Sequence, residues 1–181
     1  MAGCKGVVHM RRARHADARA IAEVHVRTWQ EAYRDLLPPQ FLAELSIEAR
    51  ERYWQSEIDC TPGDRAPWIA DAGDEVVGFA SVGPSRDADA GDRTGELYTL
   101  YVLPDCWDRG VGGDLLRRAE HDLVDHGYAE ASLWVLAGNE RARRFYEKAR
   151  WRLDGSRVER IGELEMEEVR YRKVLEPSRF S

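Results

Sequence analysis

The chain has 181 residues, of which 43% are hydrophobic, and it carries a formal net charge of -6 at pH 7. This length and composition predict a single domain, residues 1–181, with a sizeable hydrophobic core. The acidic balance argues against a general nucleic-acid binder, which normally has an excess of basic residues. It is compatible with an acidic surface that attracts cationic substrates such as amines.

The N-terminal sequence, the hydropathy and the cysteines indicate in which compartment the protein works and whether it binds a metal. The first eighteen residues are charged and contain no apolar segment, so no signal peptide is expected. No window approaches 18 apolar residues, so we expect neither a membrane span nor a membrane partner. Cys4, Cys60 and Cys106 are widely spaced and form no C-x-x-C motif, which argues against disulfides and a zinc site. We therefore expect a cytoplasmic protein without a bound metal.

The chain opens with a predicted strand, Gly6–Ala13. A helix follows from His15 to about Tyr33, and prolines at 38 and 39 interrupt the helical pattern. Ser46 is a typical N-cap for the next helix, "SIEARERYWQSEI". The first third of the chain is therefore expected to form one strand and two helices.

Two strands joined by a tight turn are predicted next, Pro67–Asp71 and Glu75–Gly83. The small and charged residues of Ser85–Gly95 predict a flexible loop. Another strand, Glu96–Pro104, should follow this loop. These segments indicate a hairpin and a third strand.

Predicted helices and strands alternate over the rest of the chain, from Gly113 onward. A helix is predicted over Gly113–His126, with Gly127 as its stop, and a strand over Glu130–Ala137. Asn139 should cap the helix "ERARRFYEKA", and two strands close the chain as an antiparallel pair. The order predicts an α/β fold, a mixed and mostly antiparallel central sheet flanked by about four helices.

The stretch "WDRGVGGDLL", Trp107–Leu116, places a glycine turn between a strand and a helix. The first N–H groups of a helix lack internal partners and attract anions, and Arg109 adds a positive charge. A P-loop is excluded because no lysine follows the glycines, and Leu115 replaces the third glycine of a dinucleotide fingerprint. A phosphate loop of another kind and a tight turn without a ligand both stay open.

A second motif, "NERARRFYEKARW", begins at Asn139. Together the two segments resemble the GNAT superfamily of acyl-CoA-dependent N-acetyltransferases, and the resemblance extends from about Gly6 to Leu175. The matching positions are Gly110, Gly112, Asn139, Ala142, Phe145, Tyr146 and Trp151. The chain departs from the family pattern at Trp107, where the family has glutamine or arginine, and at Arg150, where it has glycine.

The resemblance implies a GNAT-like fold and acetyl-CoA as co-substrate, with no metal. It implies that the backbone of the strand before the loop hydrogen-bonds the pantetheine arm, and that the loop and helix start bind the pyrophosphate. The residues implied in cofactor binding are Leu100, Tyr101, Val102, Asp108, Arg109, Gly110, Val111, Gly112, Gly113 and Asn139.

The resemblance also implies two catalytic residues. Tyr146 matches the tyrosine that protonates the leaving thiolate, although its helical spacing alone favours a core aromatic. Glu96 is the candidate base for the amine, directly or through water, and an exposed glutamate at a strand end is the alternative. Tyr98 and His25 are weaker candidates for the base. Cys106 is interpreted as a small packed residue rather than a nucleophile.

Trp29 and Tyr33 fall where the family's first helix lines the acceptor site, and a core aromatic pair is the alternative. The function implied is transfer of acetyl to a small-molecule amine or a peptide amine. A catalytically inactive acyl-CoA-binding regulatory protein and a purely structural domain are the other hypotheses. A homodimer is compatible with the two final strands.

Overall fold

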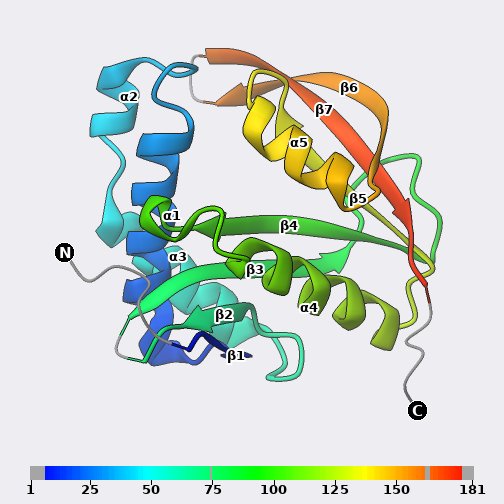
Figure 1. The fold of residues 1–181 in the computed structure, drawn as a ribbon, viewed down its shortest axis with the longest axis horizontal. Helices are drawn as coiled ribbons and strands as arrows, with labels where there is room; N and C mark the ends of the chain where they lie inside the picture. Colours follow the sequence, from blue (N-terminus) through cyan, green and yellow to red (C-terminus); the bar gives the residue numbers. More distant parts are fainter. Residues whose placement is uncertain (1–6, 74, 162–163, 177–181) are drawn as a thin grey trace. The chain divides into compact units, whose positions relative to one another are not determined.

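The computed structural model describes residues 7–73, 75–161 and 164–176 (Figure 1). Within them seven strands form one sheet in the order β1-β2-β3-β4-β5-β7-β6. The strands are β1 His9–Arg12, β2 Trp68–Asp71, β3 Val76–Pro84, β4 Thr94–Val102, β5 Glu130–Leu136, β6 Arg152–Ile161 and β7 Leu164–Val174. The helices are α1 Ala18–Ala32, α2 Pro39–Ala43, α3 Ile47–Cys60, α4 Val111–Asp125 and α5 Glu140–Lys148. The mixed, mostly antiparallel α/β fold expected from the sequence is confirmed.

The chain forms two compact units. The first unit comprises Met1–Val82 and Thr99–Asp122, and the second comprises Gly83–Tyr98 and Leu123–Ser181. Strands β3 and β4 and helix α4 each contribute residues to both units. We therefore describe the two units separately.

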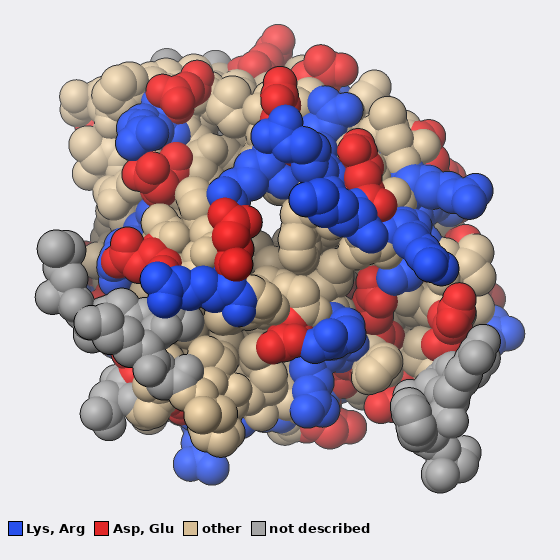
Figure 2. All heavy atoms as spheres, viewed as in Figure 1, with Lys and Arg blue, Asp and Glu red and all other residues tan. Residues whose placement is uncertain are grey.

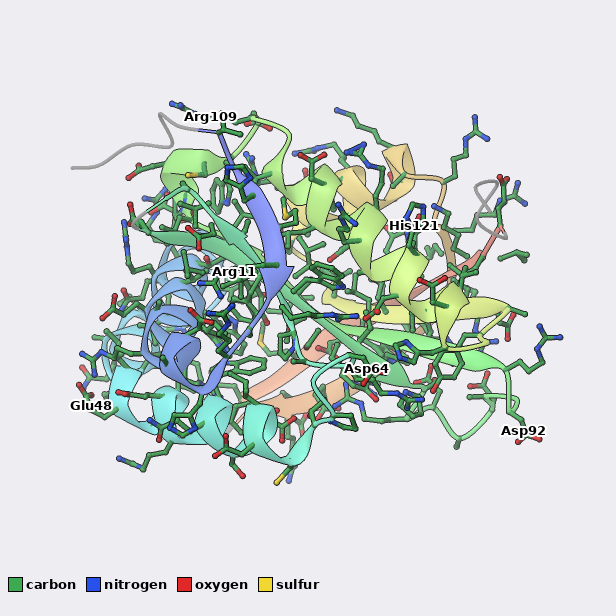
Figure 3. All side chains as sticks on the ribbon, turned by 90° about the horizontal axis from the view of Figure 1, so that it is seen from below. Arg11, Glu48, Asp64, Asp92, Arg109 and His121 are labelled. Carbon is green, nitrogen blue, oxygen red and sulfur yellow. The ribbon has the colours of Figure 1, made fainter. Side chains whose placement is uncertain are left out.

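The first unit is built on the antiparallel strands β1, β2 and β3. Ile69 and Phe79 face each other across β2 and β3, and both are fully buried. Figures 1 and 3 show α3 on one side of these strands and α4 on the other. Ile21 of α1 and Leu115 of α4 are also fully buried, so both helices contribute to the core. The predicted hairpin between β2 and β3 is confirmed.

Polar side chains define where the first helices begin. Asp17 accepts a hydrogen bond from the Arg14 N–H at 2.7 Å and also pairs with the Arg11 guanidinium. Ser46 Oγ accepts from the Ala49 N–H at 3.1 Å, as expected for an N-cap. Each contact satisfies a backbone donor that the first helical turn leaves unpaired. The predicted N-cap at Ser46 is confirmed.

In the second unit a parallel pairing joins β4 and β5. It covers three residues of β4, Thr94–Glu96, and the strand then continues to Val102. Strand β7 pairs antiparallel with both β5 and β6. The Asn139 side chain accepts from the Ala142 N–H at 3.1 Å and caps α5, as predicted.

Several boundaries differ from the sequence prediction; strand β4, for example, spans Thr94–Val102 where Glu96–Pro104 was expected. Helix α4 begins at Val111, two residues earlier than expected, so Gly112 and Gly113 belong to its first turn. A short helix, α2, begins at Pro39, because proline is well accommodated in a first turn although it interrupts a helix interior. Strand β1 begins at His9, and Gly6 lies outside the described residues.

Figure 2 shows charged residues of both signs among other residues on the face drawn, with Lys and Arg gathered over its upper middle and upper right. None of the helices in the described residues is long and apolar enough to cross a membrane.

Candidate active site

The glycine loop of the first unit leads into α4 with exposed backbone donors. Gly110 has a φ of 88°, and its carbonyl accepts the first bond of the helix, from the Asp114 N–H at 3.0 Å. The N–H groups of residues 111–113 have no partner within the part of the chain described here. Arg109 is exposed on this loop (Figure 3). The arrangement has the features of an anion site at a helix N-terminus.

The loop is anchored to β4 by an indole. Trp107 Nε1–H donates to the Val102 carbonyl at 2.7 Å. Thr28 of α1 donates its hydroxyl to the same carbonyl at 3.1 Å. The departure from the family pattern at Trp107 therefore supplies a structural contact, which fixes the start of the loop against the end of the strand.

Backbone groups at the end of β4 divide between two edges. The Leu103 N–H donates to the Val77 carbonyl of β3 at 2.8 Å. Because backbone groups alternate along a strand, Tyr101 also directs its groups toward β3, whereas Leu100 and Val102 direct theirs to the opposite edge. The Trp107 and Thr28 side chains already occupy the Val102 carbonyl. The backbone groups left to bind a ligand at the edge of β4 opposite β3 are therefore the N–H and carbonyl of Leu100 and the N–H of Val102.

An aromatic cluster lies between α1, α3, β3 and β4 in the first unit. We call it the α1 aromatic cluster, and its members are His25, Trp29, Tyr33, Trp54, Phe79 and Tyr101. The expected pair of Trp29 and Tyr33 is in edge contact, with ring centroids 5.1 Å apart. The His25 and Tyr101 rings lie 5.0 Å apart. The cluster therefore reaches the strand predicted to bind the pantetheine arm.

His25 is held neutral inside this cluster. Burial, followed by the positive charge of Arg50, lowers the pKa of His25 from 6.5 to about 3. The Trp54 Nε1–H donates to His25 Nδ1 at 3.3 Å, which assigns the imidazole proton to Nε2. With its only lone pair occupied and its basicity low, His25 does not suit the role of general base.

Glu96 is buried in the second unit and is bound by one residue. Its carboxylate accepts from the Arg86 backbone N–H at 2.8 Å and from the Arg86 guanidinium at 2.5 and 3.2 Å. The Arg86 guanidinium also lies 4.2 Å above the Tyr98 ring. The structure thus replaces the exposed strand-end glutamate considered above with a buried carboxylate in an ion pair.

Tyr146 is held at the end of α5 in the second unit. Its ring contacts Trp151 and Tyr171, with centroid separations of 6.2 and 6.4 Å. Arg150 adopts a left-handed conformation with φ of 67°, and the Trp151 N–H donates to the Tyr146 carbonyl at 3.0 Å. Arginine at this position therefore forms the turn for which the family uses glycine.

The predicted site residues are divided between the two units. Trp29, Tyr33, the end of β4 and the glycine loop lie in the first unit, and Glu96, Asn139 and Tyr146 lie in the second. Cys106 is 2% exposed, in accord with a packed residue. In the described residues no group of three or more His, Cys, Asp and Glu is placed to hold a metal ion.

Sequence reasoning missed the contacts of Arg86 and of Trp54. Arg86 lies in a polar loop, and nothing local links it to a carboxylate ten residues later. Trp54 belongs to the buried side of α3, where helical spacing predicts a core residue but not a donor to His25.

Comparison with known proteins identifies the family. The model of the acetyltransferase (GNAT) family matches residues 12–150, well over half of the chain. The chain belongs to the GNAT acetyltransferase family. An uncharacterised N-acetyltransferase, YuaI, of Bacillus subtilis is 33% identical over 134 residues, which cover 74% of each chain. A probable N-acetyltransferase of Mycobacterium tuberculosis is 32% identical over 151 residues, covering 82% of each chain.

Solved GNAT structures share the fold. The PaiA N-acetyltransferase of Thermoplasma acidophilum, solved in complex with coenzyme A, superposes with a TM-score of 0.71 at 20% identity. The comparison covers 93% of this chain and 99% of that one. The putative acetyltransferase YncA of Salmonella typhimurium, solved with acetyl-CoA, gives a TM-score of 0.69 at 17% identity and covers 96% of both chains.

Proposed function

We propose that this GNAT protein transfers the acetyl group of acetyl-CoA to an amine acceptor directly, within a ternary complex. The observation that carries the proposal is the glycine loop, where a strand end, a left-handed glycine and the unpartnered N–H groups of residues 111–113 follow one another. These donors fit a pyrophosphate. Relatives named N-acetyltransferases and two GNAT structures solved with CoA or acetyl-CoA support it.

The end of β4 is proposed to hold the pantetheine arm as an added strand. The donors and acceptors available for this are the N–H and carbonyl of Leu100 and the N–H of Val102. One of these N–H groups can also polarise the thioester carbonyl, which is worth about 3 kcal/mol per donor in other acyl transfers. Bound acetyl-CoA supplies the acetyl thioester that the amine nitrogen attacks.

Two proton transfers are assigned to the second unit. The Tyr146 hydroxyl donates a proton to the thiolate that leaves when the C–S bond breaks. Glu96 receives the proton lost by the amine, through water, because the Arg86 guanidinium occupies the carboxylate directly. Asn139 caps α5 and contributes to CoA binding by placing that helix start.

Calorimetric titration with acetyl-CoA and with desulfo-CoA tests the cofactor part of this proposal. Micromolar binding of both is expected, because the pyrophosphate and pantetheine are common to them. An amine panel assayed for free CoA then tests transfer. Binding without transfer to any amine would contradict catalysis and favour the acyl-CoA-binding regulator, whereas absence of binding would contradict the whole assignment.

A further inference from the structure

The α1 aromatic cluster contains two buried N–H donors without partners. His25 Nε2 and Trp29 Nε1 are fully buried and make no hydrogen bond to any described residue. Both carry a proton, the indole always and the imidazole because Trp54 occupies His25 Nδ1. The two rings are adjacent on α1, with centroids 5.4 Å apart. Buried donors without partners are rare in folded proteins, so this pair calls for an explanation.

A cation lies beside the two donors. The Arg50 guanidinium of α3 lies 5.7 Å from the Trp29 ring centroid, and its charge contributes to keeping His25 neutral. Arg50 forms no ion pair with any residue in the described part of the chain. No carboxylate of the described residues therefore forms an ion pair with the Arg50 guanidinium, although the chain as a whole is acidic.

Two N–H donors next to an unpaired guanidinium match the chemistry of a carboxylate, which only accepts hydrogen bonds. A neutral amide matches these donors less well, because it carries no negative charge to pair with the guanidinium. An ammonium group matches them less well, because it would meet a positive charge and two donors. The His25 ring also contacts Tyr101 of β4, the strand proposed to hold the thioester arm. A carboxylate bound here would belong to the acceptor.

We propose that His25, Trp29 and Arg50 form an acceptor subsite that binds a carboxylate, and that the acceptor is an amine bearing one, as a free amino acid does. This inference rests on the proposed function for the transfer step. His25 Nε2–H and Trp29 Nε1–H donate to the carboxylate oxygens, and the Arg50 guanidinium balances the charge. Because both nitrogens are buried, ligand entry requires the side chains that cover them to move.

Nuclear magnetic resonance tests the subsite without requiring catalysis. The indole N–H signal of Trp29, assigned with Trp29→Phe, is followed in the CoA-bound protein during titration with L-amino acids and their carboxamides. We expect the amino acids to shift this signal and the carboxamides to leave it unchanged. A dipeptide, whose carboxylate lies one residue further from the amine, distinguishes a free amino acid from a peptide N-terminus.

Variants and transfer assays complete the test. Arg50→Gln and Trp29→Phe should each weaken amino-acid binding by roughly tenfold, whereas Arg52→Gln, on an exposed position of the same helix, should not. A shift with amino acids but no transfer to any amine would support the subsite and contradict the enzyme assignment. Equal transfer to amino acids and carboxamides, or contacts of the two donors with buried water only, would overturn the subsite and leave the enzyme assignment standing.

Discussion

Glu96 and Arg86 form an ion pair in which the carboxylate is buried and the guanidinium is exposed. The Glu96 side chain is 3% exposed and that of Arg86 is 68% exposed. The backbone N–H of Arg86 binds the same carboxylate, so one residue contributes both a main-chain donor and a charged donor. This pairing ties the loop after β3 to the start of β4. In the proposed mechanism it is the reason that Glu96 receives a proton through water rather than directly.

Removal of the Arg86 side chain should destabilise the protein. In Arg86→Met the buried carboxylate keeps only the backbone donor, and loss of charged hydrogen bonds of this kind costs roughly 1.5–3 kcal/mol. Urea unfolding measures the loss. Arg93→Met removes an exposed arginine of the same loop that makes one long bond, to the Gly127 carbonyl, and serves as control. Equal stability of the two variants would show that the Glu96 pair contributes nothing.

Tyr146→Phe should separate binding from catalysis. The ring contacts with Trp151 and Tyr171 stay in place, so acetyl-CoA affinity should be unchanged. Loss of the proton donor should lower kcat by about 10²–10⁴-fold. Calorimetry and a free-CoA assay measure the two quantities. Tyr53→Phe, at a half-exposed tyrosine of α3, is the control, and unchanged turnover in Tyr146→Phe would remove Tyr146 from the acid role.

Gly113→Ala should stabilise the fold and weaken cofactor binding. A Cβ at Gly113 meets no atom within 4 Å, and alanine is favoured over glycine in a helix by roughly 0.5–1 kcal/mol. If the CoA pyrophosphate lies against this turn, the added methyl group crowds it. Thermal unfolding measures the change in stability, and calorimetry measures the change in acetyl-CoA affinity. Gly63→Ala also meets open space, but outside the loop, and its acetyl-CoA affinity should equal that of the parent.

Arg150→Gly should raise the stability. Arg150 has a φ of 67°, a conformation that costs a residue with a Cβ roughly 1–2 kcal/mol and costs glycine little. Part of this gain is offset because glycine is more flexible in the unfolded chain, which leaves about 1 kcal/mol. Urea unfolding measures it. A loss of stability would mean that the Arg150 side chain makes contacts that outweigh the backbone strain.

Burial of His25 should make stability depend on pH. Its pKa is about 3 in the folded protein and 6.5 when unfolded, so the unfolded chain takes up a proton first as the pH falls. Above about pH 6.5 His25 is neutral in both states and leaves the free energy of unfolding unchanged. Between about pH 6.5 and pH 3 this free energy falls with falling pH, by at most about 1.4 kcal/mol per pH unit.

Urea unfolding of His25→Phe between about pH 5 and pH 7 tests this dependence, and a flatter slope than that of the parent is expected. His121→Gln, at the exposed histidine of α4 marked in Figure 3, should keep the slope of the parent. Parallel slopes for His25→Phe and the parent would show that His25 is not neutralised by folding.

Much of the fold and the glycine loop before α4 could be predicted from the sequence, because both depend on local patterns. Ser46 and Asn139 cap helices through oxygens that reach N–H groups three residues later, so short-range chemistry is sufficient. The glycine loop before α4 is local in the same way. The start of α4 at Val111 was missed because glycines are poor indicators of a helix interior.

The surroundings of the candidate catalytic side chains were decided by tertiary structure. Glu96 was placed on its strand from the sequence, but its partner comes from a loop whose path depends on long-range contacts. His25 was a weak candidate base until α3 placed Trp54 and Arg50 against it, which assigned its proton and lowered its pKa. Sequence alone thus determined the family, most of the elements and the glycine loop. Only packing determined which charges are buried and which donors lack partners, because burial and pairing join residues far apart in the chain.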